Sequence, residues 1–261
     1  MYYCCGITEK GIMSHNEDAM LLHHSVMTDG MRQIGVDAPF LVAVCDGVSG
    51  EQAGELASQT CLEHLSQVRY AKKVNLKRRI LEIHNLIAEQ SRGNACENMQ
   101  TTICCAAFDE NHALRCLNVG DSRIYRYRDG VLEQLSRDQT LVQMLFEEGT
   151  ITSEEKKIHT HRNIILPAIG NIQEQPKPDM TVFSDGMQDG DILLLCSDGL
   201  TDYVTNLEIE EILALPKPLP KRLEQLVKLA LEKGGKDNIT IVTIVRYPDG
   251  MPFPHCQTMQ P

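Results

Sequence analysis

The stretch TTICCAAFDENHALRCLNVGDSRIYRYRDGVLEQL, residues 101–135, decides the fold class. Asp129-Gly130 within it is the strongest two-residue hairpin signal, and it precedes a further apolar run, Val131–Leu135. Consecutive strands joined by such short turns run antiparallel. The apolar, β-branched runs that predict the strands before this hairpin are Thr101–Phe108, Ala113–Val119 and Ser122–Arg128.

The same patterns extend outward in both directions. Further strands are predicted at Tyr2–Ile7, Ala19–His24, Phe40–Cys45, Asp191–Cys196 and Asn238–Arg246. Helical periodicity predicts helices at Gln52–Val68, Lys77–Arg92, Leu207–Ala214 and Pro220–Lys233, with two short ones at Leu141–Glu148 and Ser153–Lys157. Antiparallel strands with helices before and after them indicate an α+β fold whose helices cover the outer faces of the sheets.

Composition excludes several classes of protein. The chain has 261 residues, 42% of them hydrophobic and 23% charged, which suits a folded domain and excludes disorder. Its apolar runs are far shorter than the ~20 residues of a membrane helix, and it starts with no secretion signal. A net charge of −11 argues against nucleic acid as a partner. Residues 248–261, rich in proline and polar side chains, predict a flexible C-terminal tail.

The cysteines indicate a reducing environment. Most of the 10 cysteines lie inside apolar runs, and no CxxC pair or zinc-ligand spacing occurs. We therefore expect free, buried thiols and a cytoplasmic location.

Acidic residues at the ends of apolar strands are the most informative feature. Asp46 and Asp198 each follow such a strand and precede a glycine, Asp237 comes directly before one, and Asp121 lies between two. A strand fixes the backbone while the adjoining loop leaves the side chain accessible. Several carboxylates gathered at one sheet edge would repel one another, and a divalent cation with a preference for oxygen ligands, Mg²⁺ or Mn²⁺, would remove that penalty.

Each acid taken alone has a structural interpretation as well. A single Asp-Gly pair is usually a turn, and Asp129-Gly130 and Asp249-Gly250 keep that interpretation. Glu17 and Asp18 are neighbours, so in an extended segment they point to opposite faces, and at most one of them is expected to be a direct metal ligand.

In their order along the chain these residues resemble the protein phosphatase 2C family, metal-dependent serine/threonine phosphatases, and most of all its bacterial single-domain branch. The resemblance extends from Tyr2 to Arg246 and includes a segment similar to the bacterial flap, Asp138–Gly170. It implies one catalytic domain over residues 1–247, built as a four-layer α-β-β-α sandwich. The matching motifs are Asn16-Glu17-Asp18, Asp46-Gly47-x-x-Gly50, Thr101-Thr102, Gly120-Asp121-Ser122-Arg123, Ser197-Asp198-Gly199-Leu200 and Asp237-Asn238.

The resemblance also implies a binuclear Mn²⁺ or Mg²⁺ centre at one edge of the sandwich. Asp46 would bridge the two ions, and the Gly47 carbonyl would bind one of them. Asp198 and Asp237 would bind the other. Asp121 would join Asp198 around a third, weaker ion.

Other residues would support this centre. Asn163, in the flap-like segment, would approach the third ion, and Glu17, Asp18 and Asp202 would hold metal-bound waters. Water made nucleophilic by the ions would attack phosphorus in line, so that Asp46, Asp198 and Asp237 act in catalysis through it.

The sequence departs from the family pattern at the first motif. Met13 stands where members commonly have an arginine that binds phosphate, which predicts weaker substrate binding with the nucleophile intact. His15 is near enough to compensate, although a loop histidine is more often only solvated. Val48 stands where eukaryotic members have a histidine that serves as general acid, and Ser49 replaces a glycine.

Three other functions are alternatives to phosphatase activity. A non-catalytic relative that binds phosphopeptides or regulates a partner is favoured by Met13 and opposed by the intact set of aspartates. A haloacid dehalogenase-type phosphohydrolase needs a second acid where Val48 stands, and neither G-x-G-x-x-G nor G-x-x-x-x-G-K-[ST] occurs to bind a nucleotide. The expected partners are phosphorylated proteins, substrates of a serine/threonine kinase, acted on by a monomer without membrane or nucleic acid.

Overall fold

Two antiparallel sheets of six strands each form the centre of the protein, in a computed structural model that describes residues 1–48, 53–92 and 98–247. The first sheet has the order β4 (Gly30–Val36), β1 (Tyr2–Glu9), β12 (Ile239–Arg246), β11 (Ile192–Cys196), β8 (Arg123–Arg128) and β9 (Val131–Gln134). The second has the order β10 (Asp179–Phe183), β7 (Leu114–Val119), β6 (Ile103–Phe108), β5 (Phe40–Cys45), β2 (Ala19–Leu22) and β3 (Ser25–Met27).

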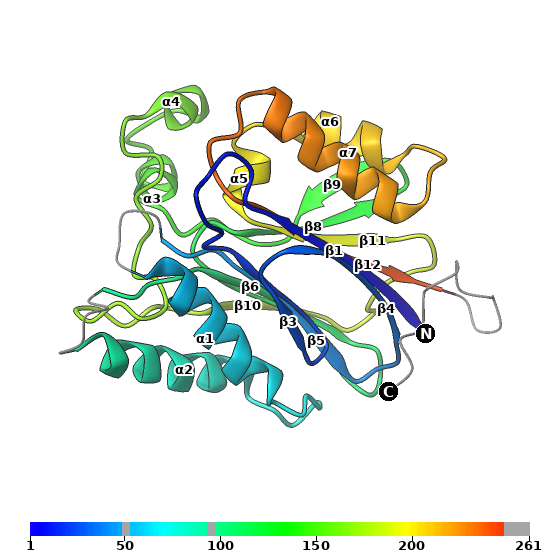
Figure 1. Ribbon diagram of the computed structural model, residues 1–261, viewed down its shortest axis with the longest axis horizontal. Helices are drawn as coiled ribbons and strands as arrows, with labels where there is room; N and C mark the ends of the chain where they lie inside the picture. The colour runs from blue at the N-terminus through cyan, green and yellow to red at the C-terminus, as the bar shows by residue number, and fades with distance from the viewer. Residues whose placement is uncertain (49–52, 93–97, 248–261) are drawn as a thin grey trace.

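Helices cover both outer faces of this pair of sheets (Figure 1). Helices α1 (Gly54–Ser66) and α2 (Leu76–Ser91) pack on the second sheet, while α5 (Asp198–Thr201), α6 (Asn206–Leu213) and α7 (Leu219–Glu232) pack on the first. The predicted α+β class and the four-layer sandwich are therefore confirmed. No helix of the described segments has the length and apolar character to cross a membrane.

The central strands are buried on both faces, which explains their unbroken apolar sequences. In β5, Val42 and Val44 face the other sheet, while Leu41, Ala43 and Cys45 pack against the helices. Burial of both faces removes the polar–apolar alternation of a half-exposed strand. The eight cysteines in the described segments are all buried and free, as expected.

The strands that the sequence did not predict lie at sheet edges. β3, β4 and β10 contain no fully buried residue, so the hydrophobic signal that marks the central strands is weak in them. The predicted strand Ala19–His24 is wrong in its last two residues, because β2 ends at Leu22 and His23 turns the chain with a left-handed φ of 59°. The predicted start of the first helix at Gln52, the position of Ser49 and the predicted tail 248–261 lie outside the described residues.

The flap-like segment holds two short helices, α3 (Leu141–Glu147) and α4 (Ser153–Ile158), that stand beside the sandwich (Figure 1). A capping box at Thr152 begins α4, which has no buried residue. A backbone bridge between Thr140 and Ile165 closes the base of the segment, and a second bridge joins Ile169 to Thr101, just before β6. This attachment places the segment beside the ends of the strands that carry the acidic residues.

Candidate metal centre

The structure brings the predicted aspartates together at one edge of the sandwich. Burial raises the pKa of Asp46 well above its usual range, and the charges of Asp18, Asp198, Asp121 and Asp237 raise it further. The pKa of Asp198 is also raised well above its usual range, first by burial and then by Asp121 and Asp237. Such mutual effects require that these carboxylates, which come from both sheets, lie close together.

Asp18 and Glu17 point to different surroundings, as their adjacent positions predict. Asp18 is 1% exposed, and its Oδ2 accepts a hydrogen bond of 2.7 Å from Ser197 Oγ. Burial raises the pKa of Asp18 to about 7, although its hydrogen bonds oppose the shift. Glu17 is only partly buried, and its backbone carbonyl accepts from Gly47 N at 3.1 Å and from Ser58 Oγ at 2.6 Å.

Two of the matched motifs act on the backbone of the site. Thr101 Oγ1 and Thr102 N each donate to the carbonyl of Asp46 at 2.8 Å. Asn238 Oδ1 accepts from Glu17 N at 2.8 Å, while Asn238 Nδ2 donates to the carbonyl of His15 at 3.1 Å. Thr101, Thr102 and Asn238 thus fix the positions of the acidic loops relative to one another.

Close backbone packing accounts for the glycines beside the acids. A Cβ on Gly47 would lie 2.5 Å from the backbone of Gly54, and one on Gly199 would lie 2.0 Å from the carbonyl oxygen of Asn238. Any side chain at Gly199 would therefore push apart the two loops that carry Asp198 and Asp237.

A cavity of about 450 Å³ separates the aspartates from the flap-like segment. Asp121, Asp198 and Asp202 line one side of it, and Arg162 and Asn163 line the other. Arg162 Nη2 reaches across to Asp202 Oδ2 at 3.0 Å. Asn163 therefore shares a cavity with Asp121.

Asp121 has an unusual environment for a carboxylate. Its Oδ1 is buried and has no hydrogen-bond partner among the described residues. Burial, followed by the charge of Asp138, raises its pKa to about 7. A buried carboxylate oxygen without a donor is costly unless a proton or a cation compensates for it.

The first motif leads to a second group of possible ligands, one of which the sequence did not reveal. His15 Nε2 lies 3.3 Å from Glu17 Oε1, and in the described part of the chain His15, Glu17 and Glu55 are the one trio whose ligand atoms all lie within 4.8 Å of one another. Glu55 is in the first turn of α1 and carries no sequence signal of its own. Met13 is partly buried, and its N–H donates to the carbonyl of Lys10 at 3.2 Å.

The residues of this edge fit Mn²⁺ or Mg²⁺. The donors are hard oxygen atoms, several of them are buried, and burial together with the charges of neighbouring carboxylates raises their pKa values. The aspartates are spaced more widely than the trio at His15, which suits ligands distributed over more than one ion.

Comparison with known proteins agrees with this geometry. The family model for protein phosphatase 2C matches residues 25–239. The serine/threonine phosphatase stp of Listeria monocytogenes is 33% identical over 233 residues, which cover 86% of this chain and 91% of that protein.

Solved structures are similar over almost the whole chain. The serine/threonine phosphatase Stp1 from Staphylococcus aureus has a TM-score of 0.82 at 31% identity, with 95% of this chain and 96% of that chain covered. The catalytic domain of the phosphatase PstP, solved with 2 manganese ions, has a TM-score of 0.74 at 31% identity, with 94% and 99% covered.

Proposed function

The chain belongs to the protein phosphatase 2C family, and on that basis we propose that its aspartate cluster hydrolyses phosphoserine and phosphothreonine in proteins with bound Mn²⁺ or Mg²⁺. The observation that carries this proposal is the cluster of carboxylates in the described residues, in which burial and then the charges of the neighbouring aspartates raise the pKa of Asp46 and of Asp198 well above the usual range. When metal is bound, Asp46, the Gly47 carbonyl, Asp198 and Asp237 would hold the ions.

Two such cations, when bound, lower the pKa of water and offset the negative charge of the phosphoryl group. The chain's own residues keep the ligands in place. Ser197 orients Asp18 through the 2.7 Å hydrogen bond, and Thr240 N donates to Ser197 Oγ at 3.0 Å, so the hydroxyl is itself fixed. Glu17, Asp18 and Asp202 surround the ligands and would accept hydrogen bonds from waters of the centre. No side chain is needed as nucleophile.

A third, weaker cation site lies on the side of the flap-like segment. The unpartnered Oδ1 of Asp121 and the shared cavity with Asn163 and Asp198 support this assignment. Because Val48 has no titratable proton, the leaving group is protonated from this side of the centre.

Substrate binding differs from that of relatives with an arginine in the first motif. Met13 cannot donate a hydrogen bond to the phosphoryl group. His15, whose side chain is 58% exposed and whose Nε2 lies 3.3 Å from Glu17 Oε1, is proposed as a partial substitute. The proposed physiological setting is a cytoplasmic monomer that reverses the action of a serine/threonine kinase.

The rival function, a phosphopeptide-binding or regulatory module, predicts binding without turnover. It is favoured by Met13 alone, whereas a module that only binds does not need the complete set of buried and partly buried aspartates.

Phosphate release from a phosphoserine peptide distinguishes the two functions. The enzyme should require added Mn²⁺ or Mg²⁺ and lose turnover in excess EDTA, and Asp198→Asn should abolish turnover by removing a ligand. Asp129→Asn is the matched control, since Asp129 lies in the β8–β9 turn at a φ of 50°, which asparagine tolerates. Full turnover in EDTA, or an active Asp198→Asn protein, would refute the proposed centre, and peptide binding without turnover would identify a module.

A further inference from the structure

A second polar pocket lies at the other end of the sandwich from the aspartates. It has a volume of about 160 Å³ and is formed by the β2–β3 turn, the start of β5 and the segment that follows α1. The lining residues are His23, His24, Pro39, Phe40, Leu41, Val68, Arg69 and Tyr70.

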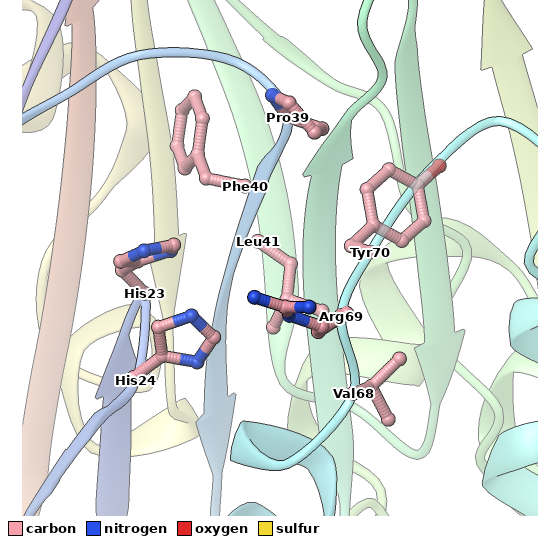
Figure 2. A pocket seen from close by; sticks show the side chains of 8 residues that line it. All are labelled: His23, His24, Pro39, Phe40, Leu41, Val68, Arg69 and Tyr70. Atoms are coloured by element: carbon pink, nitrogen blue, oxygen red, sulfur yellow. The ribbon is translucent and has the colours of Figure 1, made fainter.

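Basic side chains converge on this pocket from two sides. In Figure 2 the guanidinium of Arg69 points from one wall toward the imidazoles of His23 and His24 on the other. Arg69 is exposed and makes no hydrogen bond or ion pair within residues 1–48, 53–92 and 98–247. The chain has a net charge of −11, so a cluster of one unpaired arginine and two histidines differs in sign from the average charge of the protein.

The orientation of His24 is fixed by one hydrogen bond. Its Nδ1 lies 2.8 Å from the carbonyl oxygen of Ser66. A carbonyl only accepts, so Nδ1 carries the hydrogen and Nε2 is left for another partner. The ring centroids of His23 and His24 are 3.8 Å apart, and burial together with the charge of His24 lowers the pKa of His23. An anion between these rings and Arg69 would relieve that repulsion.

The walls of the pocket are held by the fold. His23 N donates to the carbonyl of Leu41 at 3.1 Å, which fixes the turn against β5. Tyr70 is buried, and its hydroxyl accepts a 2.5 Å hydrogen bond from Arg115 Nη1. The aromatic and aliphatic walls from Phe40, Leu41 and Tyr70 therefore stay in position whether or not the pocket is filled.

The distance from this pocket to the aspartates follows from the lengths of β5 and α1, which each connect the two places. β5 starts in the pocket at Phe40 and ends just before Asp46, a length of about 20 Å at ~3.3 Å per residue. α1 runs from Gly54, packed on Gly47, to Ser66 beside His24, which is again about 20 Å at ~1.5 Å per residue. The pocket is thus separate from the aspartate cluster.

We propose that this pocket is a second anion site, which binds the phosphate group of a phosphomonoester, either as a free small molecule or on a protein side chain. The fork of Arg69 matches two phosphate oxygens, and His24 Nε2, when protonated, donates to a third. Phe40 and Leu41 would contact the carbon side of the ester. The site does not depend on metal and goes beyond the hydrolysis proposed above.

Histidine C–H resonances in NMR spectra of the full chain, loaded with Mg²⁺, test this site directly. Inorganic phosphate should shift the His23 and His24 resonances saturably, and Arg69→Ala should weaken that binding about tenfold. Arg32→Ala is the matched control, because Arg32 is also exposed and unpaired in the described segments but lies on β4 of the other sheet. His23→Asn assigns the resonances and should also weaken phosphate binding, because it removes one imidazole. The turn should keep its conformation, since asparagine tolerates the left-handed φ.

The outcomes distinguish a free phosphate from a phosphorylated protein side chain as the ligand, and they include results that would overturn the proposal. The two ligands are compared on the Asp198→Asn protein, which should not hydrolyse the peptide. Tighter binding of inorganic phosphate than of a phosphoserine peptide identifies a free phosphate, and the reverse order identifies a protein side chain. Shifts confined to His15, which lies beside Glu17, would place all binding at the aspartate edge and overturn the proposal. An absence of saturable shifts, or equal effects of Arg69→Ala and Arg32→Ala, would overturn it as well. None of these readouts depends on turnover, so they do not bear on the proposed hydrolysis.

Discussion

Replacement of Gly199 by alanine should disconnect the two aspartate-bearing loops without removing any ligand. The new Cβ would lie 2.0 Å from the carbonyl oxygen of Asn238, and carbon atoms in this position essentially never come closer than 3.0 Å, so the loops have to separate by about 1 Å. Gly199 is bonded to Asp198 and Asn238 to Asp237, so this displacement acts directly on two proposed ligands.

The size of the effect follows from this displacement. Overpacking of this kind costs about 1–3 kcal/mol of folding free energy. A displacement of about 1 Å in a catalytic arrangement lowers turnover on the order of 100-fold. Metal affinity should fall by about 10-fold or more, as it does when groups that orient metal ligands are lost.

Calorimetric titration with Mn²⁺, turnover of a phosphoserine peptide and the melting temperature should be measured on one preparation. Gly30→Ala is the control: at a φ of 80° its Cβ is strained but meets nothing within 4 Å. That variant should lose stability, by about 1–2 kcal/mol, and keep its affinity for Mn²⁺. If Gly199→Ala binds Mn²⁺ and turns over like the wild type, the loops do not transmit the displacement and the ligand assignment of Asp198 and Asp237 is wrong.

Three further predictions concern the same edge of the sheet. The folded-state pKa values of Asp18 and Asp121, about 7, lie above the ~4 of an unfolded aspartate. Their contribution to the stability of the metal-free protein is therefore present below about pH 4 and lost as the pH rises through 7. Because Mn²⁺ competes with these protons, its effect on melting temperature should be small at pH 5 and large at pH 8, and an effect independent of pH would place the ions elsewhere. Asp121→Ala should reduce turnover of phosphoserine peptides more than that of p-nitrophenyl phosphate, whose leaving group needs no proton; equal losses would contradict the third site. Met13→Arg should lower KM for a phosphopeptide about tenfold with kcat unchanged, and an unchanged KM in a folded protein would show that residue 13 does not face the phosphate.

Local sequence patterns were sufficient to predict those strands that are buried along most or all of their length. β5, β6 and β11 are unbroken apolar runs and β1 and β12 are largely apolar, because the strands are covered on both faces, so each could be predicted from its own residues. Edge strands such as β4 and β10 were missed for the converse reason: they contain polar residues and are stabilised by pairing with a neighbour.

The order of the acidic motifs was enough to identify the family and to nominate Asp46, Asp198 and Asp237, since each stands at a strand end that the sequence itself marks. Their convergence was decided by the tertiary structure. β5 and β11 belong to different sheets, and only the packing of one sheet on the other brings Asp46 and Asp198 within reach of each other's charge.

Contacts between segments distant in sequence depend wholly on the tertiary structure. Glu55 joins His15 and Glu17 because α1 packs beside the first loop, and Arg162 meets Asp202 because the flap-like segment stands over the strand ends. Arg69 and His23, separated by the whole of β5 and α1, share one pocket. Hydrophobic periodicity depends on residues that are close together in the sequence, so it can be recognised locally. The positions of charged side chains in space depend instead on how the sheets and helices pack. That packing is determined by the sequence as a whole and not by any one segment.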